Sequence, residues 1–220
     1  MNKRLLSLAF GAAVAGVVAV STSASATGAA GAVLTVGSPT GPAVAAGDSL
    51  AASLASGTTA KIATTAGGSS GITCNTSSFA ATANTNPASP GTATETVTAH
   101  TLANCTTNII GATGVQSITV NNLPYKASVT SGGSLTVSAG TAGPIQTTLK
   151  INTILGAITC VYQAGNLTAT PANGDNSLTF KDQLFSKTSG PATCPGSGYF
   201  SAKYAPVTDV SQGNGLVFVN

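Results

Sequence analysis

A few residues in the sequence have the types and spacing that hydrolytic chemistry needs. The run Gly-Gly-Ser-Ser-Gly at residues 67–71 matches the G-x-S-x-G pattern of a hydrolase nucleophile elbow. That mechanism needs a strand before the serine, a helix after it, and a histidine that accepts the serine proton. No helical pattern follows, and the one histidine, His100, lies in a Thr-rich strand pattern where a solvent-facing position is the default. We therefore interpret the run as a turn, with a secreted hydrolase as the weaker alternative.

The acidic residues are dispersed. A glycosidase needs two carboxylates about 5–10 Å apart, and Asp182 and Asp209 are the best candidate pair in this chain. Residues 173–176, Asn-Gly-Asp-Asn, are too short for a calcium loop and predict a turn. We assign no catalytic residue, no metal ligand and no cofactor, and we expect a non-enzymatic protein. The acids are Asp48, Glu95, Asp175, Asp182 and Asp209.

The four cysteines are Cys74, Cys105, Cys160 and Cys194. In an exported protein an even number of cysteines indicates disulfides, and four cysteines allow three pairings. We favour the sequential pairing Cys74–Cys105 and Cys160–Cys194, whose loops would each add about 3–4 kcal/mol of stability in the chain-entropy model. A zinc site is the alternative, but the chain has no Cys-x-x-Cys motif and a single histidine.

Residues 1–26 have the three zones of a secretory signal peptide. Lys3 and Arg4 give a cationic start, residues 5–20 are uncharged and mostly apolar, and Ala24 and Ala26 form an A-x-A cleavage pattern. The apolar run is shorter than the roughly 20 residues that span a bilayer, so a retained anchor is the weaker alternative. We expect cleavage near Ala26 and a location outside the cell or at its surface, without a membrane span in the mature chain.

Charge is scarce in this chain, which has eight Lys and Arg and five Asp and Glu residues. Two of the basic residues lie in the signal peptide, so the mature protein is almost neutral. A neutral surface has no long-range field to attract nucleic acid. We therefore expect no nucleic-acid partner.

Short β-branched or alternating runs recur after the signal peptide, separated by Gly, Pro, Asn and Ser clusters. Ile145, Thr147, Leu149 and Ile151, for example, fall on one face of a strand. Pairs such as Gly132-Gly133 and Asn173-Gly174 suit hairpin turns. This pattern predicts an all-β protein, an antiparallel β-sandwich that is jelly-roll-like or Greek-key, with two disulfides. Residues 27–57 form an Ala/Gly/Ser-rich lead-in, and residues 58–220 form the sandwich domain.

Two parts of the expected sandwich domain are similar in sequence to each other. The triplet Ile-Thr-Cys at residues 72–74 recurs at residues 158–160, and each copy is followed by a polar turn, a strand and a second cysteine. We interpret this as two pseudo-repeated units, at about residues 72–130 and 158–210, against the alternative that Thr-rich strands look alike by chance.

Aromatic residues that could hold a sugar or another small ligand are few. The chain has no Trp and four Tyr, of which Tyr199 and Tyr204 are the candidate binding residues. Phe200 and Tyr204 share one strand face, so a core position is the stronger interpretation.

Several blocks carry a family resemblance. Residues 36–48, 86–95, 117–125, 158–164 and 200–209 resemble small exported actinobacterial proteins that are labelled only as signal-sequence-domain or hypothetical proteins. That resemblance implies no activity. The Cys–strand–Cys–Leu-Pro-Tyr arrangement is also similar to surface-located activators of alkane oxidation, which implies a role at the cell surface in contact with hydrophobic material.

These features predict a secreted or cell-surface structural or interaction protein. A low-charge, Thr-rich surface offers little repulsion against edge pairing, so we expect self-association or adhesion to the cell envelope or other extracellular material. The alternative is an extracellular module that binds a small ligand or a glycan.

Overall fold

The computed structural model describes residues 31–220, and the predicted signal peptide lies outside them. Every regular element in this part of the chain is a β-strand, which confirms the all-β prediction. The strands are β1 (Leu34–Val36), β2 (Ser49–Ser53), β3 (Ala60–Ala63), β4 (Gly71–Thr85), β5 (Thr92–Thr107), β6 (Ala112–Asn121), β7 (Tyr125–Thr130), β8 (Ser134–Ser138), β9 (Ile145–Thr153), β10 (Gly156–Ala164), β11 (Leu167–Ala172), β12 (Ser177–Ser189), β13 (Ser197–Tyr204), β14 (Thr208–Asp209) and β15 (Gly215–Val219).

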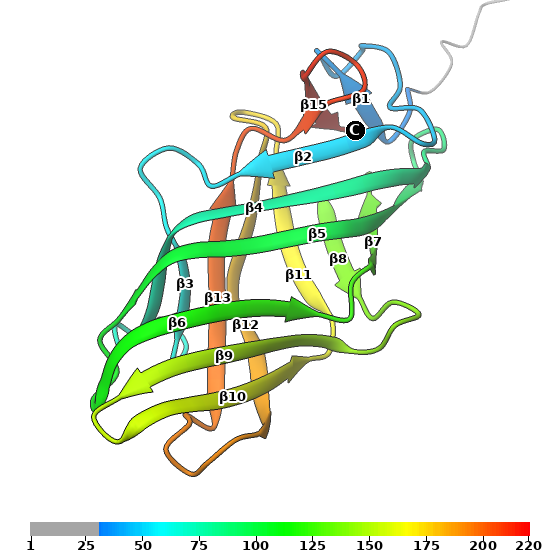
Figure 1. Cartoon of the computed structure of the whole chain (residues 1–220). Helices are drawn as coiled ribbons and strands as arrows, with labels where there is room; N and C mark the ends of the chain where they lie inside the picture. Colours follow the sequence, from blue (N-terminus) through cyan, green and yellow to red (C-terminus); the bar gives the residue numbers. More distant parts are fainter. Residues whose placement is uncertain (1–30) are drawn as a thin grey trace, which may run out of the picture.

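Eight of these strands close into an antiparallel barrel, whose arrangement can be followed in Figure 1. The pairing runs from β4 through β5, β7, β8, β11, β12, β13 and β3 and returns to β4. The structure therefore corrects the expected sandwich, because a closed ring of hydrogen-bonded strands leaves one continuous sheet in place of two. Short strands with turns between them occur in both architectures, and their pattern does not show which strands meet.

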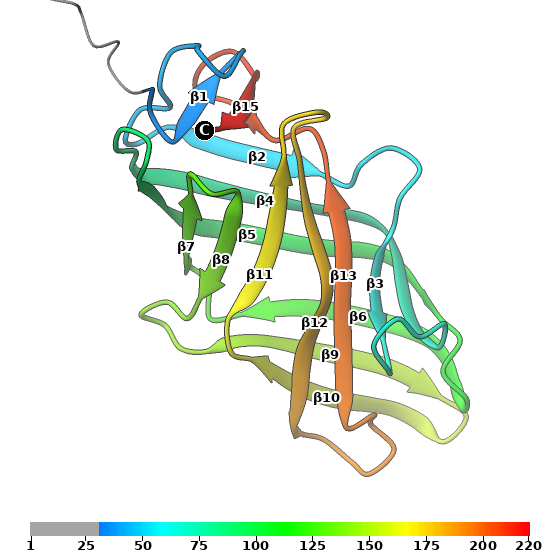
Figure 2. The same cartoon turned by 180° about the vertical axis from the view of Figure 1, so that it is seen from behind.

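The sheet continues beyond the barrel in two extensions, the flanking sheets, because the long strands of the barrel change partners along their length. β3 pairs with residues 71–74 of β4, and β2 pairs with residues 78–82 of the same edge. In the same way, β11 pairs with residues 177–180 of β12, and β10 pairs with residues 186–189. One extension continues from β2 through β14 and β15 to β1, and the other from β10 through β9 to β6 (Figure 2).

Alternating burial along the strands forms the core. Ile145, Thr147, Leu149 and Ile151 of β9 are buried, and the residues between them keep exposed surface, as the sequence predicted. β13 alternates in the same way, so that Phe200 and Tyr204 point to one side. Because side chains alternate between the two faces of a strand, every second residue of these strands points into the core.

The Ala/Gly/Ser-rich segment 27–57 contains β1 and β2. Leu34 and Val44 are buried in it, and the side chain of Asn86 holds both of them. The Leu34 N–H donates to Asn86 Oδ1 (2.9 Å), and Asn86 Nδ2 donates to the carbonyls of Leu34 and Val44 (2.8 Å each). β1 pairs with β15, so the last strand lies beside the first.

Both disulfides are present, in the sequential pairing. Cys74 and Cys105 lie directly opposite each other on β4 and β5. Cys160 of β10 is joined to Cys194 in the loop between β12 and β13. The second disulfide therefore ties a loop to a flanking sheet, whereas the first links two paired strands.

Candidate ligand-binding cavity

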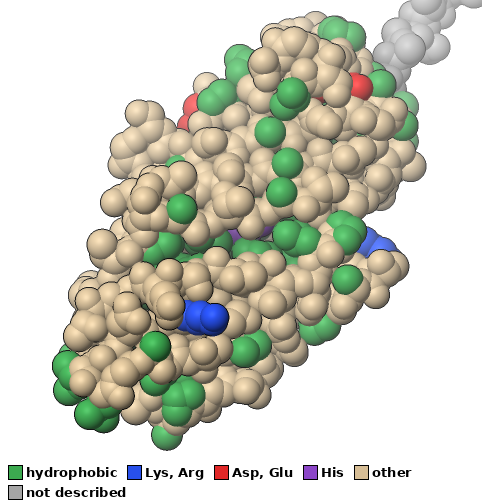
Figure 3. All heavy atoms as spheres, in the orientation of Figure 1, with side chains coloured by type: hydrophobic (Ala, Val, Ile, Leu, Met, Phe, Trp, Pro, Cys, Tyr) green, Lys and Arg blue, Asp and Glu red, His purple; other side chains and the backbone are tan. Residues whose placement is uncertain are grey.

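The barrel encloses an apolar cavity of about 90 Å³, several times the roughly 10–15 Å³ that one water molecule needs. Figure 3 shows a hollow across the middle of one face, with hydrophobic and histidine side chains on its floor. Aliphatic and aromatic side chains form most of the wall, among them Phe79, Val97, Leu102, Leu149, Phe180 and Phe200. A second hollow of about 50 Å³ shares Phe79, Glu95, Leu135 and Leu178 with the first.

The hollow lies where two neighbouring strands do not pair. β5 pairs with β7 only through residues 92–97. Beyond Val97 this edge of β5 faces β6, which pairs with β9 on its other side, and no ladder between β5 and β6 is present in the described chain (Figure 1). A side opening into the barrel follows from this gap between the two strands.

A bulge in β5 directs His100 to the cavity. Ala80 is paired with Ala99 and Ala81 with Val97, so Thr98 is an extra residue in the ladder. An extra residue reverses the alternation beyond it. Glu95 and Val97 therefore line the cavity before the bulge, and His100 and Leu102 line it afterwards. The expectation that His100 faces solvent was wrong for this reason.

His100 belongs to a chain of hydrogen bonds in the cavity wall. The imidazole Nε2 lies 2.8 Å from the Tyr204 hydroxyl, which lies 2.8 Å from Ser77 Oγ. The Ser77 hydroxyl donates to the carbonyl of Thr101 at 2.7 Å. One arrangement satisfies all three contacts: Nε2–H donates to Tyr204, Tyr204 donates to Ser77, and Ser77 donates to the carbonyl. Burial supports the neutral imidazole, because it lowers the pKa of His100 to about 4.

Ser77 Oγ also lies 3.4 Å from His100 Nε2. In the arrangement above, the Ser77 hydroxyl donates to the Thr101 carbonyl, and the Nε2–H group donates to the Tyr204 hydroxyl. The Gly-Gly-Ser-Ser-Gly run at residues 67–71 leads from β3 into a strand, β4, whereas a nucleophile elbow is followed by a helix. What the cluster does is hold β4, β5 and β13 together around the cavity.

The three tyrosines of the cavity wall all use their hydroxyls within the protein. Tyr125 donates to the carbonyl of Asn121 and accepts from the N–H of Gln146 at 3.1 Å. Tyr162 donates to the carbonyl of Pro195 at 2.8 Å, and Tyr204 belongs to the chain with His100. Burial raises the pKa of Tyr162 and of Tyr204 to about 12, so both stay neutral.

Of the two candidate binding tyrosines, the structure places only Tyr204 at the cavity. Its ring packs edge-on against Phe79, with the ring centroids 5.2 Å apart. Tyr199 alternates to the other face of β13 and does not line either hollow. The core position expected for Phe200 and Tyr204 is confirmed, and the same core surrounds the cavity.

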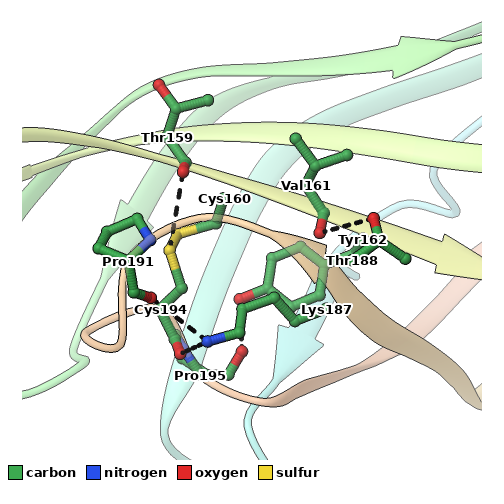
Figure 4. Close-up of a disulfide and its surroundings, with 9 residues drawn as sticks. All are labelled: Thr159, Cys160, Val161, Tyr162, Lys187, Thr188, Pro191, Cys194 and Pro195. Carbon is green, nitrogen blue, oxygen red and sulfur yellow. Dashed lines mark hydrogen bonds between the residues drawn. A yellow bond between two sulfur atoms is a disulfide. The ribbon is translucent and has the colours of Figure 1, made fainter.

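The disulfide Cys160–Cys194 stabilises one end of the cavity wall (Figure 4). It fixes the loop that carries Pro195, whose carbonyl accepts the hydrogen bond from Tyr162. The Lys187 ammonium donates to the carbonyls of Pro191 (3.3 Å) and Cys194 (3.2 Å) in the same loop. The disulfide and the Tyr162 hydroxyl therefore both attach to the loop between β12 and β13.

The structure gives the two carboxylates of the candidate pair, Asp182 and Asp209, different partners. Asp182 accepts a hydrogen bond from the N–H of Gly67 (3.0 Å), whereas Asp209 interacts with Asp48. No group of three or more His, Cys, Asp or Glu residues that could hold a metal ion is found in residues 31–220.

Sequence reasoning missed Glu95 as a cavity residue and Ser77 as the hydrogen-bond partner of the cavity residue Tyr204. For Glu95 a signal was available, because Ala93, Glu95 and Val97 alternate with threonines and so share the apolar face of β5. For Ser77 we find no such signal. Its role depends on His100 and Tyr204, which come from other strands.

Comparison of the chain with protein-family models, with curated proteins and with solved structures finds no match. Within residues 31–220 there is no helix with the length and hydropathy needed to cross a membrane.

Proposed function

We propose that this protein binds a small apolar molecule inside its barrel and acts without catalysis. The observation that carries the proposal is the apolar cavity with its side opening between β5 and β6. An eight-stranded barrel has an interior just wide enough to be filled by side chains or to hold one small ligand. Empty apolar cavities stay dry and take up apolar molecules of matching size. This favours the small-ligand alternative among the functions expected from the sequence.

Export from the cytoplasm is part of the proposal. Two disulfides support it, because such bonds persist in oxidising compartments. A binding role also agrees with the hydrogen bonds of Ser77 and His100, which in the arrangement above donate to the Thr101 carbonyl and to Tyr204.

Titration of the mature protein with 1-octanol, followed by calorimetry, tests the binding role. We expect saturable binding by the parent protein and a loss of at least about tenfold in affinity for Ala127→Phe and Ala81→Leu, which fill the cavity. Ala103→Leu is the matched control, because Ala103 lies on β5 with an exposed side chain. Equal affinity in all four proteins, or no saturable binding by the parent, would contradict the proposal.

A second function, adhesion to apolar material, is favoured by one end of the molecule. Ile110, in the β5–β6 turn, is 100% exposed, and Ile154 and Leu155, in the β9–β10 turn, are 78% and 91% exposed. The two turns are adjacent, since the Ile154 N–H donates to the Gly111 carbonyl at 3.4 Å. Three aliphatic side chains at the tips of uncharged turns suit insertion into a fluid apolar surface.

Partition of the protein onto hexadecane droplets tests adhesion. The double variant Ile110→Ser/Leu155→Ser is expected to lose most of its binding to the droplets, and Val210→Ser, a control at a different exposed apolar position, is expected to keep it. If the double variant binds as well as the parent, this end of the molecule is not an adhesive surface.

A further inference from the structure

Glu95 is a carboxyl group held in apolar surroundings. It lies near the start of β5, between Ala83 of β4 and Ala127 of β7, so neither neighbour across the ladder offers a polar side chain. Only 7% of its surface is exposed, and it lines both hollows of the barrel interior. The carboxyl group therefore belongs to the wall of the space in which a ligand would sit.

No protein group compensates this carboxyl group in residues 31–220. Its pKa is raised to about 7 by desolvation alone, without a contribution from a hydrogen bond or a nearby charge. The salt bridge of this part of the chain joins Lys203 to Asp175, two side chains that keep solvent exposure. A buried carboxylate without donors is costly, and the usual compensation is a cation or several hydrogen-bond donors.

The other titratable groups that face the cavity are all neutral near pH 7. They are His100 of β5, Tyr125 of β7, Tyr162 of β10 and Tyr204 of β13. The pKa of His100 is about 4, and burial raises the pKa of each tyrosine. The three tyrosine hydroxyls already have protein partners. Glu95 is thus the one wall residue in the described chain that carries charge and lacks a partner.

We propose that the ligand is an apolar amine, whose ammonium group lies against the Glu95 carboxylate while its hydrocarbon part fills the cavity. This rests on the proposed function, since it names the class of molecule that the same cavity binds. An ammonium group supplies three donors and the opposite charge, and charge-assisted hydrogen bonds are about twice as strong as neutral ones. An alcohol supplies a single neutral donor. A fatty-acid anion would add a second negative charge where the wall offers no cation.

Three ligands of equal chain length distinguish these classes: 1-octylamine, 1-octanol and octanoate, each titrated at pH 8 by calorimetry. We expect 1-octylamine to bind about tenfold or more tightly than 1-octanol, and octanoate to bind more weakly than both. In Glu95→Gln the affinity for 1-octylamine should fall to that for 1-octanol. The affinity for 1-octanol should stay within about threefold of the wild-type value.

The wild-type protein supplies a second measurement that does not depend on the folding of a variant. Between pH 6 and pH 8 Glu95 changes from mostly protonated to mostly ionised, so the affinity for 1-octylamine should rise about tenfold while that for 1-octanol does not rise. If 1-octanol binds and the amine has no advantage or no pH dependence, the amine inference is overturned and the cavity function stands. If none of the three ligands binds, both fail together.

Discussion

His100 and Tyr204, which lie 104 positions apart in the chain, are joined by a 2.8 Å hydrogen bond in the wall of the barrel cavity. The contact connects β5 to β13, two strands that are not paired with each other. With Ser77 of β4 it brings three strands of the ring together at one point. The tyrosine hydroxyl is the middle member and a hydrogen-bond partner of both outer groups, and Ser77 Oγ also contacts the Thr101 carbonyl (2.7 Å) and His100 Nε2 (3.4 Å).

Removal of that hydroxyl by Tyr204→Phe is expected to lower the free energy of unfolding by about 1–3 kcal/mol, because it leaves Ser77 and His100 without this partner. Urea denaturation measures the change. Tyr199→Phe is the matched control on the same strand, since the Tyr199 hydroxyl has no hydrogen-bond partner in residues 31–220, and its stability should change by less than about 0.5 kcal/mol. Similar losses in the two variants would show that the hydrogen-bonded chain adds nothing specific.

Glu95 and His100 make opposite contributions to the pH dependence of stability. Glu95 has a folded-state pKa of about 7 against an ordinary value of 4.5, so the folded state holds more protons than the unfolded state in that interval. Its stabilising contribution is complete below pH 4.5 and is lost as the pH rises through 7. His100 has a pKa of about 4 against 6.5, so its contribution is complete above pH 6.5 and is lost as the pH falls through 4.

We therefore expect the stability of the wild-type protein to depend little on these two groups between pH 4.5 and 6.5, where their slopes cancel. In Glu95→Gln only the titration of His100 remains, so the free energy of unfolding should rise by about 2–3 kcal/mol from pH 4 to 6.5. In His100→Gln only the titration of Glu95 remains, so the free energy of unfolding should fall by a similar amount from pH 4.5 to 7. Urea midpoints across this range measure both. Parallel curves for all three proteins would refute the opposed titration.

The two disulfides are expected to differ in their effect on the cavity. Removal of either pair by double substitution to alanine should lower the free energy of unfolding by about 2–4 kcal/mol. Only Cys160→Ala/Cys194→Ala should also weaken 1-octanol binding, by about tenfold, because it frees the loop whose Pro195 carbonyl holds Tyr162. Cys74→Ala/Cys105→Ala is the control, since the paired strands β4 and β5 keep their register without it. Equal losses of affinity in both variants would contradict this link.

The sequence predicts local structure well here and the cavity poorly, for a physical reason. Alternation in residues 145–151 and turn signals such as Gly132-Gly133 are local, and the structure has the strand and the hairpin that they predict. Closure of the barrel depends on pairing between β3 and β13, which are far apart in sequence, and no local sequence signal predicts that these two strands pair. The orientation of His100 depends on a single extra residue, Thr98, which a strict period of two does not anticipate.

The last prediction concerns Asp209 of β14, in the flanking sheet that runs from β2 to β1. It is fully buried, its Oδ2 has no hydrogen-bond partner in residues 31–220, and its Oδ1 accepts from the Gln212 N–H at 3.0 Å. Burial raises its pKa, and the nearby charge of Asp48 raises it further. The contribution of Asp209 to stability is therefore complete below its ordinary pKa of 3.8 and is lost as the pH rises through the folded-state value.

Asp209→Asn keeps an oxygen for Gln212 and places an amide donor in the position of Oδ2, next to the Asp48 carboxylate. We expect this variant to be more stable than the parent by about 1 kcal/mol at pH 7, and the gain to disappear near pH 3, where the parent aspartate is protonated. Asp48→Asn is the matched control with the opposite sign. The Asp48 carboxylate accepts from Gln212 Nε2 and from the Ala45 N–H, both at 2.8 Å, and these bonds lower its pKa. Loss of the Asp48 carboxylate should therefore destabilise the protein at pH 7. Thermal unfolding of Asp209→Asn and of Asp48→Asn at pH 7 and pH 3 measures both changes in stability. A destabilised Asp209→Asn at pH 7 would mean that the charged form of Asp209 is the one that the fold prefers.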